Sequence, residues 1–404
     1  MSEKTVTFGA VGDVNFSGTC GEQMQANGRG WPFEKMLPHL GRAELLFGNM
    51  ESALLPRDYA DKRIDPAGLV SKYDGTAALK QAGFGFMSLA NNHVLDGGQV
   101  AMFHTRQAIE RRGIATGGVG ATQEEARRMR VVRAGGLSFG FLCYCEDSNY
   151  SLGTRGACHA YYRPADVLAD VAYNRRGVDV LVVSIHADLE FMPTPSLPRR
   201  QAFRQIAAAG AAIVLGHHPH VPQGVELVDG SLIAYSLGNF YFAAHTDKYM
   251  KDNGPHTAHS FLLLAEVGRG GVESFRRVPF AIRQPPQQRP APLRGKQKAE
   301  LLAYFDRLDA MVRDDQAVRR NWREIALRHL DIYLKKVKDC GREDLLEDLL
   351  GRLLLVAENR SWVNEVFEAV KERWARQAAR ADPYHRPHYV LQGRRKSARP
   401  KANS

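Results

Sequence analysis

Three histidines stand within four residues in the segment Gly216-His217-His218-Pro219-His220, directly after an apolar run. Imidazole binds zinc, iron and manganese, and three imidazoles this close together have little structural purpose. His218 and His220 are two residues apart, so in an extended loop both side chains can face the same side. We therefore predict that this loop binds a metal ion.

Further segments of similar chemistry also follow apolar runs. They supply carboxylates, carboxamides and one histidine each at most: Asp13 and Asn15; Glu51; Asn91, Asn92, His93 and Asp96; His186, Asp188 and Glu190; and Asn239. Taken singly, such residues are more often turn residues or helix caps. A carboxylate can bridge two metal ions, and a pair of ions roughly 3.5–4 Å apart can polarise a phosphoryl or carbonyl oxygen. The set predicts metal-dependent chemistry if the fold brings the segments together.

The elements around these segments predict how they meet. Short apolar runs indicate strands at Val6–Val11, Leu45–Phe47, Phe86–Leu89, Phe139–Cys145, Val178–Ile185, Ala212–Leu215, Leu232–Tyr235 and Phe261–Val267. Amphipathic segments indicate helices at Gly75–Ala82, Gln99–Arg112, Glu124–Met129, Pro164–Asn174 and Leu197–Ala209. This alternation predicts an α/β fold with much parallel pairing. In open α/β sheets, ligands bind beyond the carboxyl ends of the strands, where each chemical segment lies.

The composition changes at QPPQQRPAP, residues 284–292. We predict a main domain over 5–282, a proline-rich linker over 283–295, a helical region over 296–392 and a basic disordered tail over 393–404. Helices are expected at Lys296–Arg313, Gln316–Val337, Glu343–Val356 and Trp362–Arg380. Their leucine stripes at helical spacing indicate packing seams.

Charge and cysteine content restrict the partners and the compartment. The net charge is +11, but residues 296–404 hold 24 basic and 17 acidic side chains, which leaves only +4 for residues 1–295. A nucleic-acid partner is therefore the least favoured function, with the tail as its only support. The 5 cysteines form no zinc-binding spacing, and there is no secretory signal or long apolar stretch. We expect a cytoplasmic protein with no transmembrane segment.

Six blocks of this sequence resemble the CapA family of bacterial capsule and poly-γ-glutamate synthesis proteins. They are GDVNFSG (12–18), GNMESAL (48–54), SLANNHVLDGG (88–98), SIHADLE (184–190), VLGHHPHVPQGVE (214–226) and YSLGNFYF (235–242), in order within residues 5–282. The resemblance implies the metallophosphatase-like (calcineurin-like) fold, a four-layer β-sandwich flanked by helices. The helical region after residue 295 is not covered.

The resemblance also implies roles for single residues at a site for two divalent ions of manganese, iron or zinc. The implied ligands are Asp13 and His220 for the first ion, Asn92, His186 and His218 for the second, and Glu51 as the bridge. His93 would be the acid that protonates the leaving group or stabilises its charge. Positions that support these ligands or face the substrate would be Asn15, Asn91, Asp96, Asp188, Glu190, His217 and Asn239.

Two functions are left open by the resemblance. The first is a metal-dependent hydrolase of a phosphoester or an amide, linked to the synthesis of a capsule or poly-γ-glutamate type polymer. The second is a non-catalytic accessory protein that binds the polymer or organises its synthesis complex. The expected partner is an anionic polymer or a phosphoester or amide substrate, with polymer-synthesis enzymes as further candidates. Specificity is expected from the loops Arg57–Ser71 and His245–Pro255.

Overall fold

The computed structural model describes residues 5–59, 68–146, 158–339 and 362–372, and the side chains of the long helix that ends at Asp339 only as far as Leu327. Several predicted features lie outside the described residues. They are Cys340, the helix Glu343–Val356, the second half of the helix Trp362–Arg380, the tail 393–404 and residues 60–67 of the first specificity loop.

The first large sheet contains the strands that hold Asp13 and lead into Glu51. Its order is β18-β17-β16-β1-β2-β5-β6, and β15 also pairs with β1. β1, β2, β5 and β6 are parallel, whereas β16, β17 and β18 extend the sheet in antiparallel fashion. The bounds are β1 Val6–Val14, β2 Leu45–Met50, β5 Phe84–Ser88, β6 Ala115–Gly117, β15 Asn239–Tyr241, β16 His259–Gly268, β17 Gly271–Ile282 and β18 Pro290–Pro292.

The second large sheet has the order β13-β14-β12-β11-β9-β8, with β14, β12, β11 and β9 parallel. Its bounds are β8 Arg130–Ala134, β9 Leu137–Cys145, β11 Val180–His186, β12 Ile213–His217, β13 Val225–Val228 and β14 Ser231–Ala234. Two short pairs stand apart: β3 Ala53–Leu54 with β4 Val70–Ser71, and β7 Val119–Gly120 with β10 Cys158–His159. Every predicted strand coincides with an observed one.

A layer of phenylalanines packs between the sheets. Phe8, Phe47 and Phe86 come from the first sheet, and Phe139 and Phe141 from the second. The rings of Phe86 and Phe141 stack with their centroids 3.9 Å apart. All five side chains are buried, so this layer is a major part of the apolar surface that holds the sheets together.

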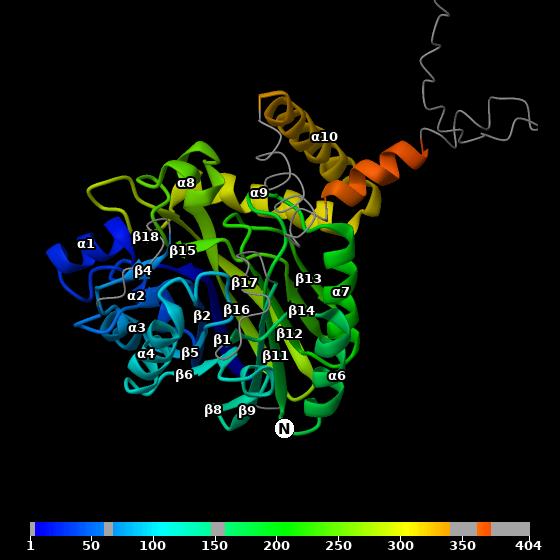
Figure 1. Cartoon of the computed structure of the whole chain (residues 1–404). Coiled ribbons are helices and arrows are strands. Elements are labelled where there is room, and N and C mark those ends of the chain that lie inside the picture. The colour runs from blue at the N-terminus through cyan, green and yellow to red at the C-terminus, as the bar shows by residue number, and fades with distance from the viewer. Residues whose placement is uncertain (1–4, 60–67, 147–157, 340–361, 373–404) are drawn as a thin grey trace, which may run out of the picture.

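Helices cover the outer faces of both sheets. In Figure 1, α1, α3 and α4 lie beside the first sheet and α6 and α7 beside the second, and separate apolar clusters join each set to its sheet. Their bounds are α1 Gly18–Asn27, α2 Leu37–Leu40, α3 Thr76–Ala82, α4 Gly98–Glu110, α5 Gln123–Ala126, α6 Pro164–Asn174, α7 Leu197–Ala208 and α8 Lys248–Asp252. This helix–sheet–sheet–helix layering of the described residues confirms the predicted four-layer α/β fold.

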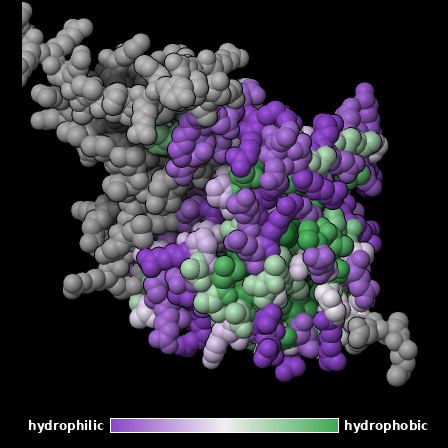
Figure 2. All heavy atoms as spheres, turned by 90° about the vertical axis from the view of Figure 1, so that its right-hand side faces the viewer, coloured by the Kyte–Doolittle hydropathy of each residue, from purple (hydrophilic) through white to green (hydrophobic). Residues whose placement is uncertain are grey.

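Local sequence explains why these helices start and face as they do. α7 begins after Ser196, whose side chain accepts a hydrogen bond from the Arg199 amide, a cap typically worth about 1 kcal/mol. α7 then buries Phe203 and Ile206 against the second sheet. Figure 2 shows this side of the molecule, where hydrophilic side chains make up most of the surface and hydrophobic ones form patches.

The segment 283–295 leads directly from sheet to helix. Pro290–Pro292 form β18, which pairs with the end of β17, and the side chains of Gln288 and Arg289 are buried. α9 (Gly295–Arg313) follows and inserts Phe305 and Leu308 into the core between the sheets. α9 therefore shares the core of the main domain. The predicted domain boundary at this segment remains a prediction.

α10 (Asp315–Asp339) packs beside the loop that follows β11. The indole nitrogen of Trp322 donates to the carbonyl of Pro195 at 2.8 Å, and the side chain is buried with Leu189 and Met192.

Among the described residues, no helix combines the length and apolar character that crossing a membrane requires.

Candidate metal centre

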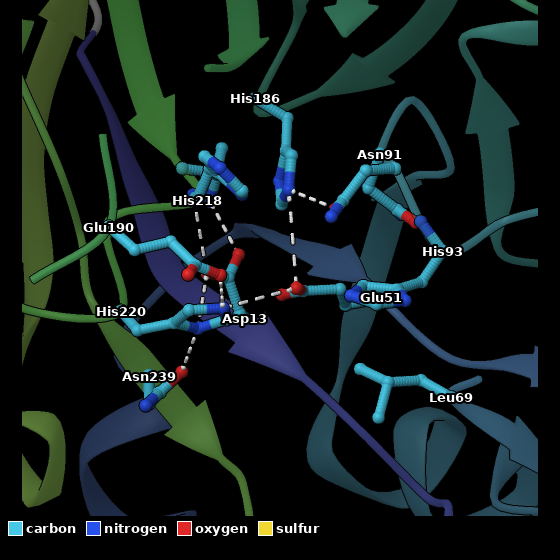
Figure 3. Close-up of polar contacts among 12 residues, drawn as sticks. Asp13, Glu51, Leu69, Asn91, His93, His186, Glu190, His218, His220 and Asn239 are labelled. Atoms are coloured by element: carbon cyan, nitrogen blue, oxygen red, sulfur yellow. Dashed lines mark hydrogen bonds and ion pairs between the residues drawn. The ribbon is translucent and has the colours of Figure 1, made fainter. Parts of the chain in front are cut away.

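The predicted chemical segments meet where the strands of both sheets end. Asp13 lies near the end of β1 and Glu51 directly follows β2, both in the first sheet. His186 ends β11 and the loop of His218 and His220 follows β12, both in the second sheet. Figure 3 shows these side chains pointing toward one another, with Glu51 and Glu190 approaching from opposite sides.

Asp13 is fully buried and surrounded by polar partners. Its Oδ1 accepts a hydrogen bond from Asn49 Nδ2 at 2.8 Å and lies 3.2 Å from His217 Nδ1. Its Oδ2 lies 3.8 Å from His220 Nδ1. Burial opposes ionisation, but the hydrogen bond and charge of His217, with help from His220 and Asn49, lower the pKa of Asp13 below its ordinary value. These neighbours therefore favour the ionised form of Asp13 despite its burial.

Glu51 is also fully buried, but its environment is the reverse. Neither carboxylate oxygen accepts a hydrogen bond from any described residue. Oε1 lies 3.5 Å from His220 Nε2 and 4.0 Å from His186 Nε2. Burial raises the pKa of Glu51 well above its ordinary value, and the charges of Asp13 and Glu190 raise it further. An uncompensated buried carboxylate is strongly unfavourable, so this donor set fits a bound cation.

The orientation of His220 supports the same interpretation. Its Nδ1 lies 2.8 Å from Asn239 Oδ1, so Nδ1 donates and Nε2 carries the lone pair. Nε2 faces two carboxylates, Glu51 Oε1 at 3.5 Å and Glu190 Oε1 at 3.6 Å. Lone pairs facing lone pairs repel unless a cation lies between them. Burial lowers the pKa of His220, which keeps it neutral as a ligand must be.

The histidine loop holds a strained backbone. His218 has a backbone φ of 95° and His220 a φ of 56°, values that residues other than glycine rarely adopt. Each such residue costs roughly 1–3 kcal/mol and persists only where its surroundings fix it. This backbone conformation places both imidazoles near the carboxylates. The rings of His186 and His218 lie 4.8 Å apart.

His186 and Asn92 form the other side of the centre. His186 Nε2 lies 2.8 Å from Asn92 Oδ1, and its Nδ1 lies 3.3 Å from Asn49 Nδ2. Burial, together with the neighbouring histidines, holds the pKa of His186 well below its ordinary value. His186 is therefore neutral at physiological pH.

Two overlapping groups of side chains could hold a metal ion. One contains Asp13, Glu51 and His220, and the other Glu190, His218 and His220, with the ligand atoms of each group within 4.8 Å of one another. Four of these five residues are predicted ligands. Glu190, predicted only to support ligands or face substrate, is placed by the structure among the possible ligands.

His93 lies at the edge of this centre with a carboxylate behind it. Its Nδ1 is 2.7 Å from Asp96 Oδ2, which also accepts from the Leu69 amide at 2.7 Å. Asn91 supports the same turn, since its Oδ1 accepts from the His93 amide and its Nδ2 donates to the Met50 carbonyl. With 19% of its side chain exposed, His93 can reach both solvent and site.

Two residues predicted to support ligands or face the substrate, Asn15 and Asp188, form hydrogen bonds within turns. The Asn15 side chain accepts from the Ser17 amide at 2.7 Å, just before α1. Asp188 has φ 89°, and its Oδ2 accepts from the Ser196 amide at 2.7 Å. Asp188 belongs to neither of the two possible metal-binding groups.

Two residues outside the predicted site also contact the centre, Asn49 and Tyr249. Asn49 of β2 bonds to Asp13, and its position two residues before Glu51, on the same side of an extended chain, is the signal that could have found it. Tyr249 of α8 donates to Glu190 Oε2 at 2.5 Å. It lies within the predicted loop His245–Pro255, but nothing in the sequence singles it out.

The fold and the site define a class of four-layer α/β proteins with carboxylates and histidines clustered where two sheets end. Within it, the family model described as "Bacterial capsule synthesis protein PGA_cap" matches residues 7–244, more than half of the 404 residues, and this chain belongs to that family.

Named relatives agree with this membership. The "PGA biosynthesis protein CapA" of Bacillus subtilis (strain 168) is 26% identical over 301 residues, covering 72% of this chain and 75% of that protein. The "Capsule biosynthesis protein CapA" of Bacillus anthracis is 28% identical over 270 residues, covering 62% and 65%. Among solved structures, a novel phosphatase from Mycoplasma pneumoniae aligns with a TM-score of 0.46 at 14% identity, over 70% of this chain and 96% of that chain.

Proposed function

We propose that this protein is a metal-dependent hydrolase that cleaves a phosphoester or an amide during the synthesis of a capsule or poly-γ-glutamate type polymer. The observation that carries the proposal is Glu51, a buried carboxylate without a hydrogen-bond donor among the described residues, facing His220 across 3.5 Å. The family and the names of its Bacillus members supply the link to polymer synthesis.

The residues divide into binding and proton-transfer roles. Asp13 and His220 would hold one metal ion, Asn92, His186 and His218 a second, and Glu51 both, with Glu190 as an additional ligand. Bound manganese, iron or zinc would supply Lewis-acid activation of the oxygen atoms that react. Asn49, His217 and Asn239 orient the ligands through the hydrogen bonds described above.

His93 would move the proton at the leaving group. Asp96 accepts at Nδ1, so Nε2 is the atom that can face a substrate. From there His93 would donate a proton to the leaving oxygen or nitrogen, or stabilise the charge that develops on it. Asp96 fixes the ring orientation while the Leu69 amide holds Asp96 in place.

The test compares the wild type, His93→Ala and a control, His39→Ala, a histidine of α2 outside the centre. Each is loaded with manganese, analysed for metal, and assayed on a phosphodiester and a γ-glutamyl amide. We expect His93→Ala to slow turnover about 10²–10⁴-fold with unchanged metal content. Full activity in that variant would overturn the role of His93.

The accessory function predicts a different outcome. It draws support from a Mycobacterium tuberculosis relative named "Probable polyglutamine synthesis accessory protein", 25% identical over 274 residues. If the metal-loaded wild type turns over neither substrate class but retains an anionic polymer, the hydrolase proposal fails and the accessory function replaces it.

A further inference from the structure

A cavity of about 700 Å³ opens on the outer side of the first sheet. Its walls come from the end of α1, the β3–β4 pair, the start of α3 and the last turns of α4, which Figure 1 shows on the same side of the molecule. None of the residues assigned above to the metal centre lines it. This volume is in the range of sites that bind small molecules or short chain segments.

The lining of the cavity is strongly basic. It includes Arg29, Arg57, Lys72, Arg111 and Arg112, but Asp74 is the single carboxylate among its described lining residues. These cations come from four separate segments of the chain. Residues 1–295 carry a net charge of only +4, so this concentration is a local feature and not a reflection of overall composition.

Most of these charges are not neutralised by the protein. Asp74 pairs with Arg112 at 3.7 Å. Among the described residues, no carboxylate lies within 4.0 Å of the charged groups of Arg29, Arg57 or Lys72. Like charges gathered around a cavity repel one another, and an anion between them relieves the repulsion.

The arrangement favours an extended ligand over a compact one. The side chains of Arg29, Arg57, Lys72 and Arg111 are exposed and come from four separate segments of the chain, so they do not form one buried cluster of the kind that encloses a single compact anion. The apolar residues Leu54, Leu55 and Ala108 line the same cavity. A chain with several spaced anionic groups matches cations distributed in this way.

Carboxylates match better than nucleic acid. Single-stranded nucleic acid binds through aromatic platforms on which bases stack. Among the described lining residues, Tyr73 is the one Phe, Tyr or Trp side chain on which a base could stack, and the Lys72 ammonium lies 5.4 Å from its ring centroid. The cavity therefore does not offer a series of stacking surfaces. We propose that this cavity binds a segment of a polycarboxylate chain, a choice of ligand that rests on the proposed polymer function.

The cavity wall is connected to the metal centre. Leu54 of β3 lines the cavity and stands three residues after Glu51. Ser71 of β4 also lines it and stands two residues after Leu69, whose amide is bonded to Asp96. The β3–β4 pair thus contributes to the cavity wall and is joined through short stretches of chain to residues of the candidate metal centre.

The test measures binding of a fluorescent ten-unit γ-linked glutamate oligomer to the full chain, with chelator present so that hydrolysis does not interfere. The variant is Arg29→Ala/Arg57→Ala/Lys72→Ala. The control, Arg133→Ala/Arg176→Ala/Lys298→Ala, removes the same charge from exposed positions that do not line the cavity. We expect a loss of roughly 10–100-fold in affinity for the first and little change for the second, with binding that weakens as salt rises.

Other outcomes would overturn the proposal. An equal loss in both triple variants would show attraction by net charge alone, and single-stranded DNA bound as tightly as the oligomer would contradict the carboxylate assignment. If the triple variant does not fold, Arg57→Glu, at an exposed position after β3, must show the loss instead. Hydrolysis of a small phosphodiester by the triple variant separates the two proposals, because it should be unchanged whether or not the cavity binds polymer.

Discussion

Asn49 connects three residues of the metal centre. Its Nδ2 donates to Asp13 at 2.8 Å and lies 3.3 Å from His186, and its Oδ1 accepts from Asn91 at 3.4 Å. We expect Asn49→Ala to lower the affinity for manganese about 10–100-fold, because residues that orient ligands typically contribute this much. Titration calorimetry measures it, with Asn27→Ala as the control, since Asn27 bonds only within α1. Equal affinities would show that Asn49 does not orient the ligands.

Metal binding should depend on pH with a definite sign. Burial lowers the pKa of His186, so the folded protein favours the neutral imidazole more than the unfolded chain does. The stability of the folded protein is therefore unaffected by His186 above pH 6.5, the ordinary histidine value, and decreases as the pH falls below it. Burial raises the pKa of Glu51, so ionising it makes the metal-free protein less stable as pH rises above 4.5. Manganese requires neutral histidines and an ionised Glu51.

The thermal stabilisation by manganese should therefore be larger at pH 8 than at pH 6. Differential scanning calorimetry with and without the ion checks this. Glu51→Gln should raise the melting temperature of the metal-free protein at pH 8 and abolish most of the manganese effect. A manganese effect that is the same at both pH values in the wild type would contradict the assignment.

Individual site residues could be predicted from the sequence where the side chain carries metal-binding atoms. Asp13, Glu51, His218 and His220 combine metal-binding atoms with a position after a strand, and the structure brings them together. The turn bonds of Asn15 and Asp188 depend on the local backbone. The contact of Tyr249 in α8 with Glu190 joins two residues that are 59 positions apart in the sequence, which no local pattern encodes.

At the scale of elements, central strands could be predicted and edge strands could not. β9 and β11 are buried along their whole length and read as continuous apolar runs. β8 and β13 are edge strands, and β17 is partly exposed and includes Arg276 and Arg277, so their patterns are mixed. Glu124–Met129 was predicted as a helix, but α5 ends at Ala126, ahead of β8.

The histidine loop depends on a close approach of two elements. A Cβ atom on Gly216 would lie 1.8 Å from the Tyr235 carbonyl oxygen, a backbone atom that cannot move aside. We expect Gly216→Ala to destabilise the protein by about 3 kcal/mol or more, in the range of severe overpacking. Urea denaturation measures this. Gly270→Ala, where no atom lies within 4 Å, should be nearly neutral, and equal effects would contradict the prediction.

At the scale of the molecule, α9 is expected to belong to the main folding unit. Phe305 is buried between the sheets, with its ring centroid 4.9 Å from that of Phe261 in β16. We expect Phe305→Ala to lower the free energy of unfolding by about 3–5 kcal/mol. Phe367→Ala, at a position that is 60% exposed, should change it by less than about 0.5 kcal/mol. Separate unfolding transitions before and after residue 295 would instead support the predicted linker.

The candidate ligands come from both sheets, and the phenylalanine layer lies between those sheets. Phe47 of that layer lies against the His217 ring, with centroids 5.7 Å apart, and His217 in turn contacts Asp13. We expect the thickness of this apolar layer to affect the spacing of the candidate ligands through the contact between Phe47 and His217. Manganese and zinc differ in the ligands they prefer, so we expect substitutions in this layer, for example at Phe86 or Phe141, to change the relative affinity of the candidate centre for the two ions.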